Sequence, residues 1–369
     1  MTDRAAQYSR IKYTLSFIET ALLLVLLFLA CRTGWAARFP GILERAYGPS
    51  FVTLPVYLGG AFAVWYLVSF PLNFYQSFLL EHRFGLSTQG PGGWFRDQLI
   101  SLGLVYAFSL LLLSALFWAV ARFPVSWWLV ISSIWVAVNV VIARLAPVVI
   151  VPLFFKYTKL ADEELRGRII ALAAKMRVRV LDVFAIDMSR KTVKANAGLL
   201  GWGAGRRVVV GDTLLSRYSA DEIEVILAHE FAHQKLRHLP KLLAVNALAA
   251  FACFFLMYAT APFFLAVSGL RRIDDAAAIP LVFAYFVIFG LATQPAVNLV
   301  SRRMERNADL MALCATGAAG AFISSMEKLG AQNLADRAPH PLIKWFFFDH
   351  PPLGERIAYA RRTSTRTRI

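Results

Sequence analysis

Six long apolar stretches constrain this chain more than any other feature of its sequence. A helix needs about 20 mostly apolar residues to cross a bilayer, and six stretches approach or exceed that length: 14–31, 51–74, 98–120, 126–152, 242–267 and 277–300. Of the 369 residues, 58% are hydrophobic and 17% are charged, whereas soluble domains have roughly 45–50% and about 25%. The sequence therefore excludes a soluble, disordered or coiled-coil protein and predicts a mainly α-helical, polytopic membrane protein with six or seven transmembrane helices.

The first stretch has an alternative interpretation as a signal peptide, because basic residues precede it. Its length of about 18 apolar residues exceeds the 7–15 of a signal core and favours a retained helix.

The charges are concentrated in two polar blocks. Residues 154–240 contain 15 Lys and Arg against 10 Asp and Glu, and residues 301–369 contain 11 against 6. Two spans separate the blocks, so both lie on the same face of the membrane. Because basic loops favour the cytoplasm, we expect this face to be cytoplasmic. The formal net charge of +16 then reports orientation rather than binding to nucleic acid.

This pattern divides the chain into four parts. Residues 1–153 form an N-terminal region of four spans, 154–241 a polar block, 242–300 two further spans, and 301–369 a C-terminal segment. The pattern of the polar block predicts a small α+β unit, with a helix over 162–177, a strand over 180–186 and a hairpin of 192–200 with 206–211. Ser219 and Glu222 have the spacing of a capping box, which predicts a helix of about 20 residues.

That helix carries a metal-binding motif, His229-Glu230-Phe231-Ala232-His233. Residues four apart share a helix face, so both imidazoles are able to bind one metal ion. Glu230 is rotated away from that helix face and is suited to take a proton from a metal-bound water molecule. Zinc is the expected ion, since it combines such ligands with an open position for water. His238 lies off the ligand face, and we expect it to be interfacial.

A catalytic zinc ion bound by two histidines lacks one protein ligand. Glu305 and Asp309 follow the last span on the predicted catalytic face, and their spacing points them the same way on a helix. Glu305 is a candidate third ligand, and Asp309 a candidate partner that orients a histidine or an arginine. On its own, a glutamate among arginines at a helix end is more often simply solvated.

Four segments together resemble the membrane-bound zinc metalloendopeptidases of the CAAX prenyl protease 1 family, which are related to the heat-shock protease HtpX. Residues 228–233 resemble the zinc helix of that family, and 305–309 resemble its E-x-x-A-D motif. Residues 350–357 (HPPLGERI) and 81–86 (EHRFGL) are similar to its C-terminal motif and to its loop between early membrane helices. The loop favours the CAAX prenyl protease branch over HtpX.

The resemblance implies a zincin-like catalytic domain with one zinc ion per chain, held by His229, His233 and Glu305. It further implies that His350 stabilises the oxyanion and that Arg356 supports the ligands through Asp309. Asn196 and Ala197 resemble the family's edge-strand segment, to which an extended substrate adds as a strand. The expected partners are the lipid bilayer and a peptide or protein substrate, either membrane-associated or C-terminally prenylated, with no nucleic acid.

Two other functions remain open from the sequence. One is HtpX-like quality control of membrane proteins by the same chemistry. The other is a non-enzymatic scaffold or transporter in which the metal site is structural.

Overall fold

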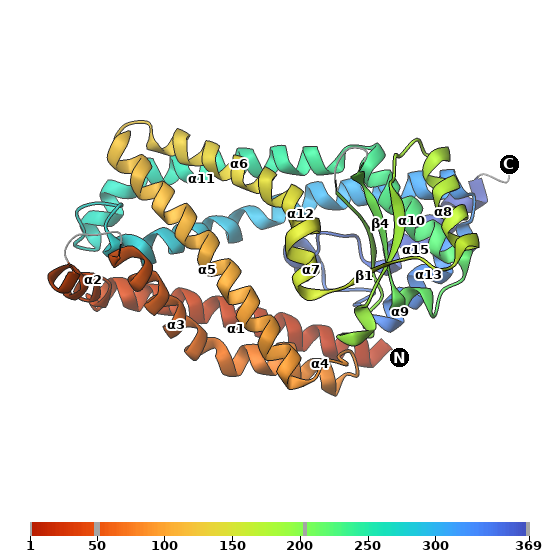
Figure 1. Cartoon of the computed structure of the whole chain (residues 1–369), viewed down its shortest axis with the longest axis horizontal. Helices are drawn as coiled ribbons and strands as arrows, with labels where there is room; N and C mark the ends of the chain where they lie inside the picture. Colours follow the sequence, from red (N-terminus) through yellow and green to blue (C-terminus); the bar gives the residue numbers. More distant parts are fainter. Residues whose placement is uncertain (1, 48–51, 202–204, 367–369) are drawn as a thin grey trace.

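The computed structural model describes residues 2–47, 52–201 and 205–366, and it places a bundle of long helices at one end and a smaller α+β unit at the other (Figure 1). Within these residues, six helical segments are long and apolar enough to cross a membrane, which confirms the six predicted spans. They contain the helices α1 (Thr2–Arg32), α3 (Thr53–Phe74), α5 (Pro91–Arg122), α6 (Trp127–Leu145), α11 (His238–Val267) and α12 (Ile279–Thr316).

Several of these segments continue beyond a single regular helix. A π-helical turn, η1 (Tyr75–Leu79), joins α3 to the short helix α4 (Leu80–Arg83), and a second turn, η2 (Ala146–Ile150), joins α6 to α7 (Val151–Phe154). The helix α2 (Trp35–Tyr47) has 13 residues, or about 20 Å, which is too short for a hydrocarbon core of about 30 Å.

The α+β unit contains a four-stranded sheet in the order β1-β2-β4-β3. The strand β1 (Tyr157–Lys159) pairs antiparallel with β2 (Asp182–Ile186), which pairs parallel with β4 (Arg207–Gly211). The strand β3 (Ala197–Leu200) pairs antiparallel with β4, so the predicted hairpin is confirmed, although residues 202–204 of its loop lie outside the described residues. This arrangement leaves β3 at the edge of the sheet.

Two helices complete the core of this unit. The helix α8 (Glu163–Lys175) begins at Asp162, which caps it, and α10 (Ala220–Lys235) begins at the predicted capping box of Ser219 and Glu222. α10 ends earlier than predicted, because Arg237 adopts the left-handed conformation and interrupts the helix before α11 begins. Between helices and sheet lie fully buried apolar side chains, including Ile169, Val208, Val210, Leu227 and Phe231.

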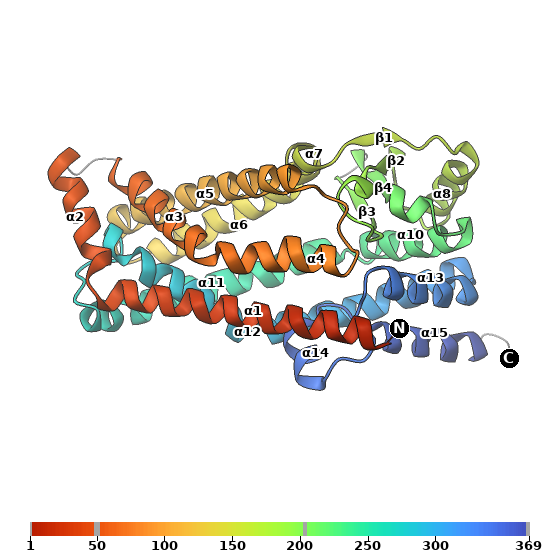
Figure 2. The same ribbon diagram turned by 90° about the horizontal axis from the view of Figure 1, so that it is seen from below.

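The C-terminal segment brings the second polar block to the first. α12 leaves the bundle and continues into the α+β unit, where α13 (Ala319–Gln332) and α15 (Leu353–Arg366) pack together (Figures 1 and 2). A short helix, α14 (Pro341–Phe347), packs against α12, and α1 runs alongside α12 (Figure 2). The expectation that both polar blocks occupy one face is therefore met, because they meet in space.

α4 and the loop that follows it are attached to the segment that precedes β3. The Glu81 carboxylate accepts a hydrogen bond from the Tyr8 hydroxyl (2.5 Å) and forms an ion pair with Lys194 (2.8 Å), just before β3. Ser87 and Thr192 form a β-bridge. These contacts tie the membrane helices to the strand segment that leads into the edge of the sheet.

Candidate active site

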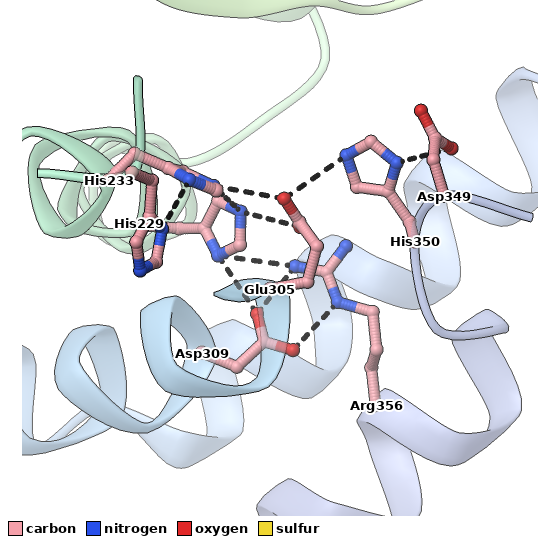
Figure 3. Close-up of polar contacts among 8 residues, drawn as sticks. His229, His233, Glu305, Asp309, Asp349, His350 and Arg356 are labelled. Carbon is pink, nitrogen blue, oxygen red and sulfur yellow. Dashed lines mark hydrogen bonds and ion pairs between the residues drawn. The ribbon is translucent and has the colours of Figure 1, made fainter. Parts of the chain in front are cut away.

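Two helices bring together the residues of the zinc motif and the candidate third ligand. α10 carries His229 and His233, and α12 carries Glu305, which is buried between them (Figure 3). The Nε2 atom of His229 lies 3.2 Å from Glu305 Oε2, and the Nε2 atom of His233 lies 3.2 Å from Oε1. The two Nε2 atoms are 3.0 Å apart. Three side chains from two helices that are distant in sequence thus converge on one point.

The donor atoms fit a tetrahedral metal ion. Ligand atoms 2.0–2.1 Å from such an ion lie about 3.3 Å from one another, close to the separations of 3.0–3.2 Å found here. Glu305 Oε2 is buried and has contact with His229 but no partner in hydrogen-bonding geometry. A buried carboxylate oxygen without such a partner is costly unless another ligand satisfies it. Two nitrogens and one carboxylate also form the ligand set of catalytic zinc sites.

His229 has a charged outer partner. Its Nδ1 atom lies 2.9 Å from Asp309 Oδ1. Arg356 on α15 donates two hydrogen bonds to Asp309, from Nη2 to Oδ1 (2.6 Å) and from Nε to Oδ2 (2.9 Å) (Figure 3). This bidentate pair is nearly free of solvent, so it fixes Asp309 and, through it, the orientation of the His229 ring.

His233 has a neutral outer partner that sequence reasoning missed. His238 is buried, with 2% exposure, and its Nδ1 atom lies 2.9 Å from Nδ1 of His233. Sequence reasoning assigned His238 no part in the metal site, whereas the structure places it against His233. The left-handed conformation of Arg237 (φ 55°, ψ 44°) interrupts the helix, and His238, the first residue of α11, contacts the ring of His233. A non-glycine residue in this conformation carries a conformational cost, which the surrounding structure must offset.

This contact leads to a prediction about metal affinity. A neutral His233 that binds a metal through Nε2 carries its hydrogen on Nδ1 and donates it to Nδ1 of His238. Loss of such a partner typically weakens metal binding by 10–100-fold. We expect about this loss of zinc affinity for His238→Ala, measured by competition with a fluorescent chelator. His238→Asn places an amide oxygen near the position of the lost acceptor and should recover most of the zinc affinity. If His238→Ala binds zinc as tightly as the unsubstituted protein, His238 does not support His233.

His350 approaches the same carboxylate from the C-terminal segment. Its Nε2 atom lies 3.4 Å from Glu305 Oε1, and its Nδ1 atom lies 2.8 Å from Asp349 Oδ1. The hydrogen bond to Asp349 raises the pKa of His350, which favours a protonated ring that donates hydrogen bonds.

Two buried polar residues of α12 hold the segment that carries His350. Asn298 Nδ2 donates to the carbonyl of Phe346 (2.5 Å), and Arg302 donates to the carbonyls of Lys344 (3.2 Å) and Phe348. Arg302 and Asn298 stand one and two helical turns before Glu305 and lie on the same buried face. Their spacing along α12 is a signal in the sequence that the known motifs do not include.

A cleft of about 620 Å³ lies beside the cluster. Its walls include Glu230 and both candidate edge residues, Asn196 and Ala197. Phe347 and Phe348 line it from the C-terminal segment and contact the ring of Tyr13 in α1. The structure thus places every sequence-predicted site residue in or beside one cleft.

We expect metal binding at this site to release a proton. Burial lowers the pKa of His229, but hydrogen bonds to Asp309 and Glu305 outweigh burial and raise the pKa to about 9 in the metal-free protein. Below pH 9 a metal must therefore displace a proton, so its apparent affinity falls as pH falls, by up to about tenfold per pH unit.

Calorimetric titration at pH 7.5, in buffers of different ionisation enthalpy, counts this proton. Asp309→Asn removes the carboxylate that raises the pKa and should reduce the release. Metal binding by the unsubstituted protein with no proton release would contradict the assignment.

The architecture and the cluster of two histidines and a glutamate define a polytopic membrane metalloprotease. In agreement, residues 159–364 match peptidase family M48, and residues 2–156 match the CAAX prenyl protease N-terminal region, described as five membrane helices. The chain belongs to peptidase family M48.

Named relatives place the chain among CAAX prenyl proteases of type 1. It is 30% identical to CAAX prenyl protease 1 of Saccharomyces cerevisiae, over 79% of this chain and 68% of the yeast protein. It is 29% identical to the uncharacterized metalloprotease YhfN of Bacillus subtilis, over 97% and 85% of the two chains. The crystal structure of S. mikatae Ste24p superposes with a TM-score of 0.84 at 26% identity and covers 96% of this chain and 88% of that one.

Proposed function

We propose that this membrane metalloprotease is a zinc endopeptidase in which His229, His233 and Glu305 bind the metal. The observation that carries the proposal is the convergence of these three side chains, with ligand atoms within 4.8 Å of one another, beside a cleft that contains Glu230. When bound, zinc lowers the pKa of a water molecule and polarises a peptide carbonyl.

The surrounding residues supply the remaining chemistry. Glu230 takes the proton of the attacking water and passes it to the leaving amine as a general base and then a general acid. His350, which approaches Glu305 from the side away from His229 and His233, donates a hydrogen bond to the developing oxyanion. Asp309 and Arg356 orient His229. The backbone of Asn196 and Ala197 binds an extended substrate at the edge of the sheet.

A chelation experiment tests the metal dependence. Purified protein is freed of metal with a chelator and then assayed for peptide cleavage, with and without added zinc. We expect cleavage to disappear and then to return with zinc. Cleavage that survives complete metal removal would contradict the proposal.

For the substrate, we propose C-terminally prenylated peptides, in line with the names of the relatives. The assay offers a farnesylated CAAX-type peptide, the same peptide without the lipid, and a misfolded membrane protein, with Glu230→Gln as the control for contaminating proteases. A preference for the lipidated peptide supports this substrate. Cleavage of the misfolded protein alone would favour the alternative, HtpX-like quality control.

We also propose that the catalytic unit faces the cytoplasm, because both polar blocks are basic. Cys314 provides a native reporter, since it is exposed near the catalytic end of α12. In intact cells, a membrane-impermeant maleimide should label Cys314 only after permeabilisation, with Cys314→Ala as the blank. Labelling of Cys314 before permeabilisation would reverse the orientation.

A further inference from the structure

Along the outer edge of β3 and of the segment before it, some backbone groups already have hydrogen-bond partners and others do not. Gly211 N–H donates to the carbonyl of Asn196 (2.9 Å), which makes this pair the hydrogen-bonded kind in the antiparallel ladder. Because backbone groups alternate in direction along a strand, those of Ala195, Ala197 and Leu199 point away from β4. Among the described residues, no other strand pairs with this side of β3.

Two side-chain amides close one part of this edge. Ala195 N–H donates to Asn333 Oδ1 (2.9 Å), and Asn333 Nδ2 donates to the carbonyl of Ala195 (3.2 Å), so one side chain makes both bonds of a neighbouring strand. Gln332 Nε2 donates to the carbonyl of Val193 (2.6 Å), whose N–H donates to the carbonyl of Leu86 (3.1 Å). The backbone at Val193 and Ala195 is therefore already satisfied.

We propose that Asn333, with Gln332, ends the substrate-binding edge at Ala195, so that a substrate pairs its main chain only with Ala197 and Leu199. This inference rests on the proposed function, in which the edge strand binds the substrate. Asn333, Ala195 and Ala197 line the same cleft as Glu230, so the closed position lies within the substrate's path. A bound peptide must leave the line of the sheet there.

The consequence is an asymmetric requirement for substrate length. On the open side, each added residue that pairs with the strand gains main-chain hydrogen bonds, and two such bonds are worth roughly tenfold in affinity. On the closed side, the peptide meets cleft side chains such as Ala335 and Asp336 and gains no strand pairing. Asn333 is thus a specificity-determining residue that limits main-chain recognition to one side of the scissile bond.

Two series of unmodified peptides test this inference. Both keep one scissile bond; one series grows toward the N-terminus and the other toward the C-terminus, one residue at a time. For the unsubstituted protein, kcat/KM should rise roughly tenfold as one series grows and stay nearly constant as the other grows. In Asn333→Ala, the backbone of Ala195 becomes available for pairing. In this variant, kcat/KM should therefore also rise as the second series grows.

A matched variant separates this effect from a general disturbance of α13. Tyr218 donates to Gln332 Oε1 (3.0 Å), so Tyr218→Phe loses a bond to the neighbouring residue and leaves both bonds between Asn333 and Ala195. It should keep the asymmetry of the unsubstituted protein.

Four outcomes would each contradict a different step. Equal rises in both series for the unsubstituted protein would overturn the closed edge and leave the edge strand as the substrate site. An unchanged asymmetry in Asn333→Ala, with normal zinc content, would overturn the role of Asn333. No rise in either series would contradict strand pairing itself, and cleavage that is insensitive to a chelator would contradict the proposed metal chemistry.

Discussion

Replacement of Glu230 by Gln is expected to lower kcat for peptide cleavage by about 10²–10⁴-fold, the contribution typical of a positioned general base. Glutamine retains the size and polarity of the side chain but accepts no proton. Since Glu230 is not among the three clustered ligands, zinc content should remain close to one per chain. The measurement combines single-turnover cleavage with elemental analysis of the same preparation.

Glu224→Gln is a matched control for this variant. Glu224 lies on the same helix and pairs with Arg168 (2.6 Å), away from the metal cluster. It should retain activity and zinc. Full activity in Glu230→Gln would rule out the proposed proton transfer, whereas loss of zinc from it would place Glu230 among the ligands.

Replacement of Glu305 by Gln is expected to weaken zinc binding by more than the 100-fold upper range associated with loss of an outer partner. The carboxylate is buried and lies 3.2 Å from both metal-facing nitrogens. An amide is neutral and a poorer ligand for zinc, so the two histidines are left to hold the ion alone. Competition titration with a chelating dye measures the change.

Glu355→Gln serves as the control. Glu355 is an exposed carboxylate in the C-terminal segment, and it pairs with Lys344 and Arg306. Its zinc affinity should match that of the unsubstituted protein. If Glu305→Gln binds zinc with unchanged affinity, Glu305 is not a ligand.

Local patterns predicted much of this fold. The capping box at Ser219, the helix capped by Asp162 and the hairpin ending at Gly211 each depend on a few neighbouring residues, and the structure contains all three. The apolar stretches predicted the six spans because the bilayer fixes the length of a crossing helix. The even number of spans between the two polar blocks placed Glu305 on the same face of the membrane as His229 and His233.

Features that depend on tertiary contacts escaped prediction. His238 was placed by helical spacing from His233, but a left-handed residue, Arg237, breaks the helix between them and changes the geometry. The amide of Asn333 reaches the backbone of Ala195 across 138 positions of the chain. No periodicity encodes such a contact, because it depends on how α13 packs against the sheet.

The unbroken course of α12 determines how deep the metal site lies relative to the membrane. From Ile279 to Val300 the helix covers about 33 Å, close to the hydrocarbon thickness of about 30 Å, and Glu305 follows within a further 8 Å. We therefore expect Glu305 at the level of the lipid headgroups, at a height set by the number of residues in one helix. A substrate anchored in the same leaflet would meet the metal without leaving the bilayer surface.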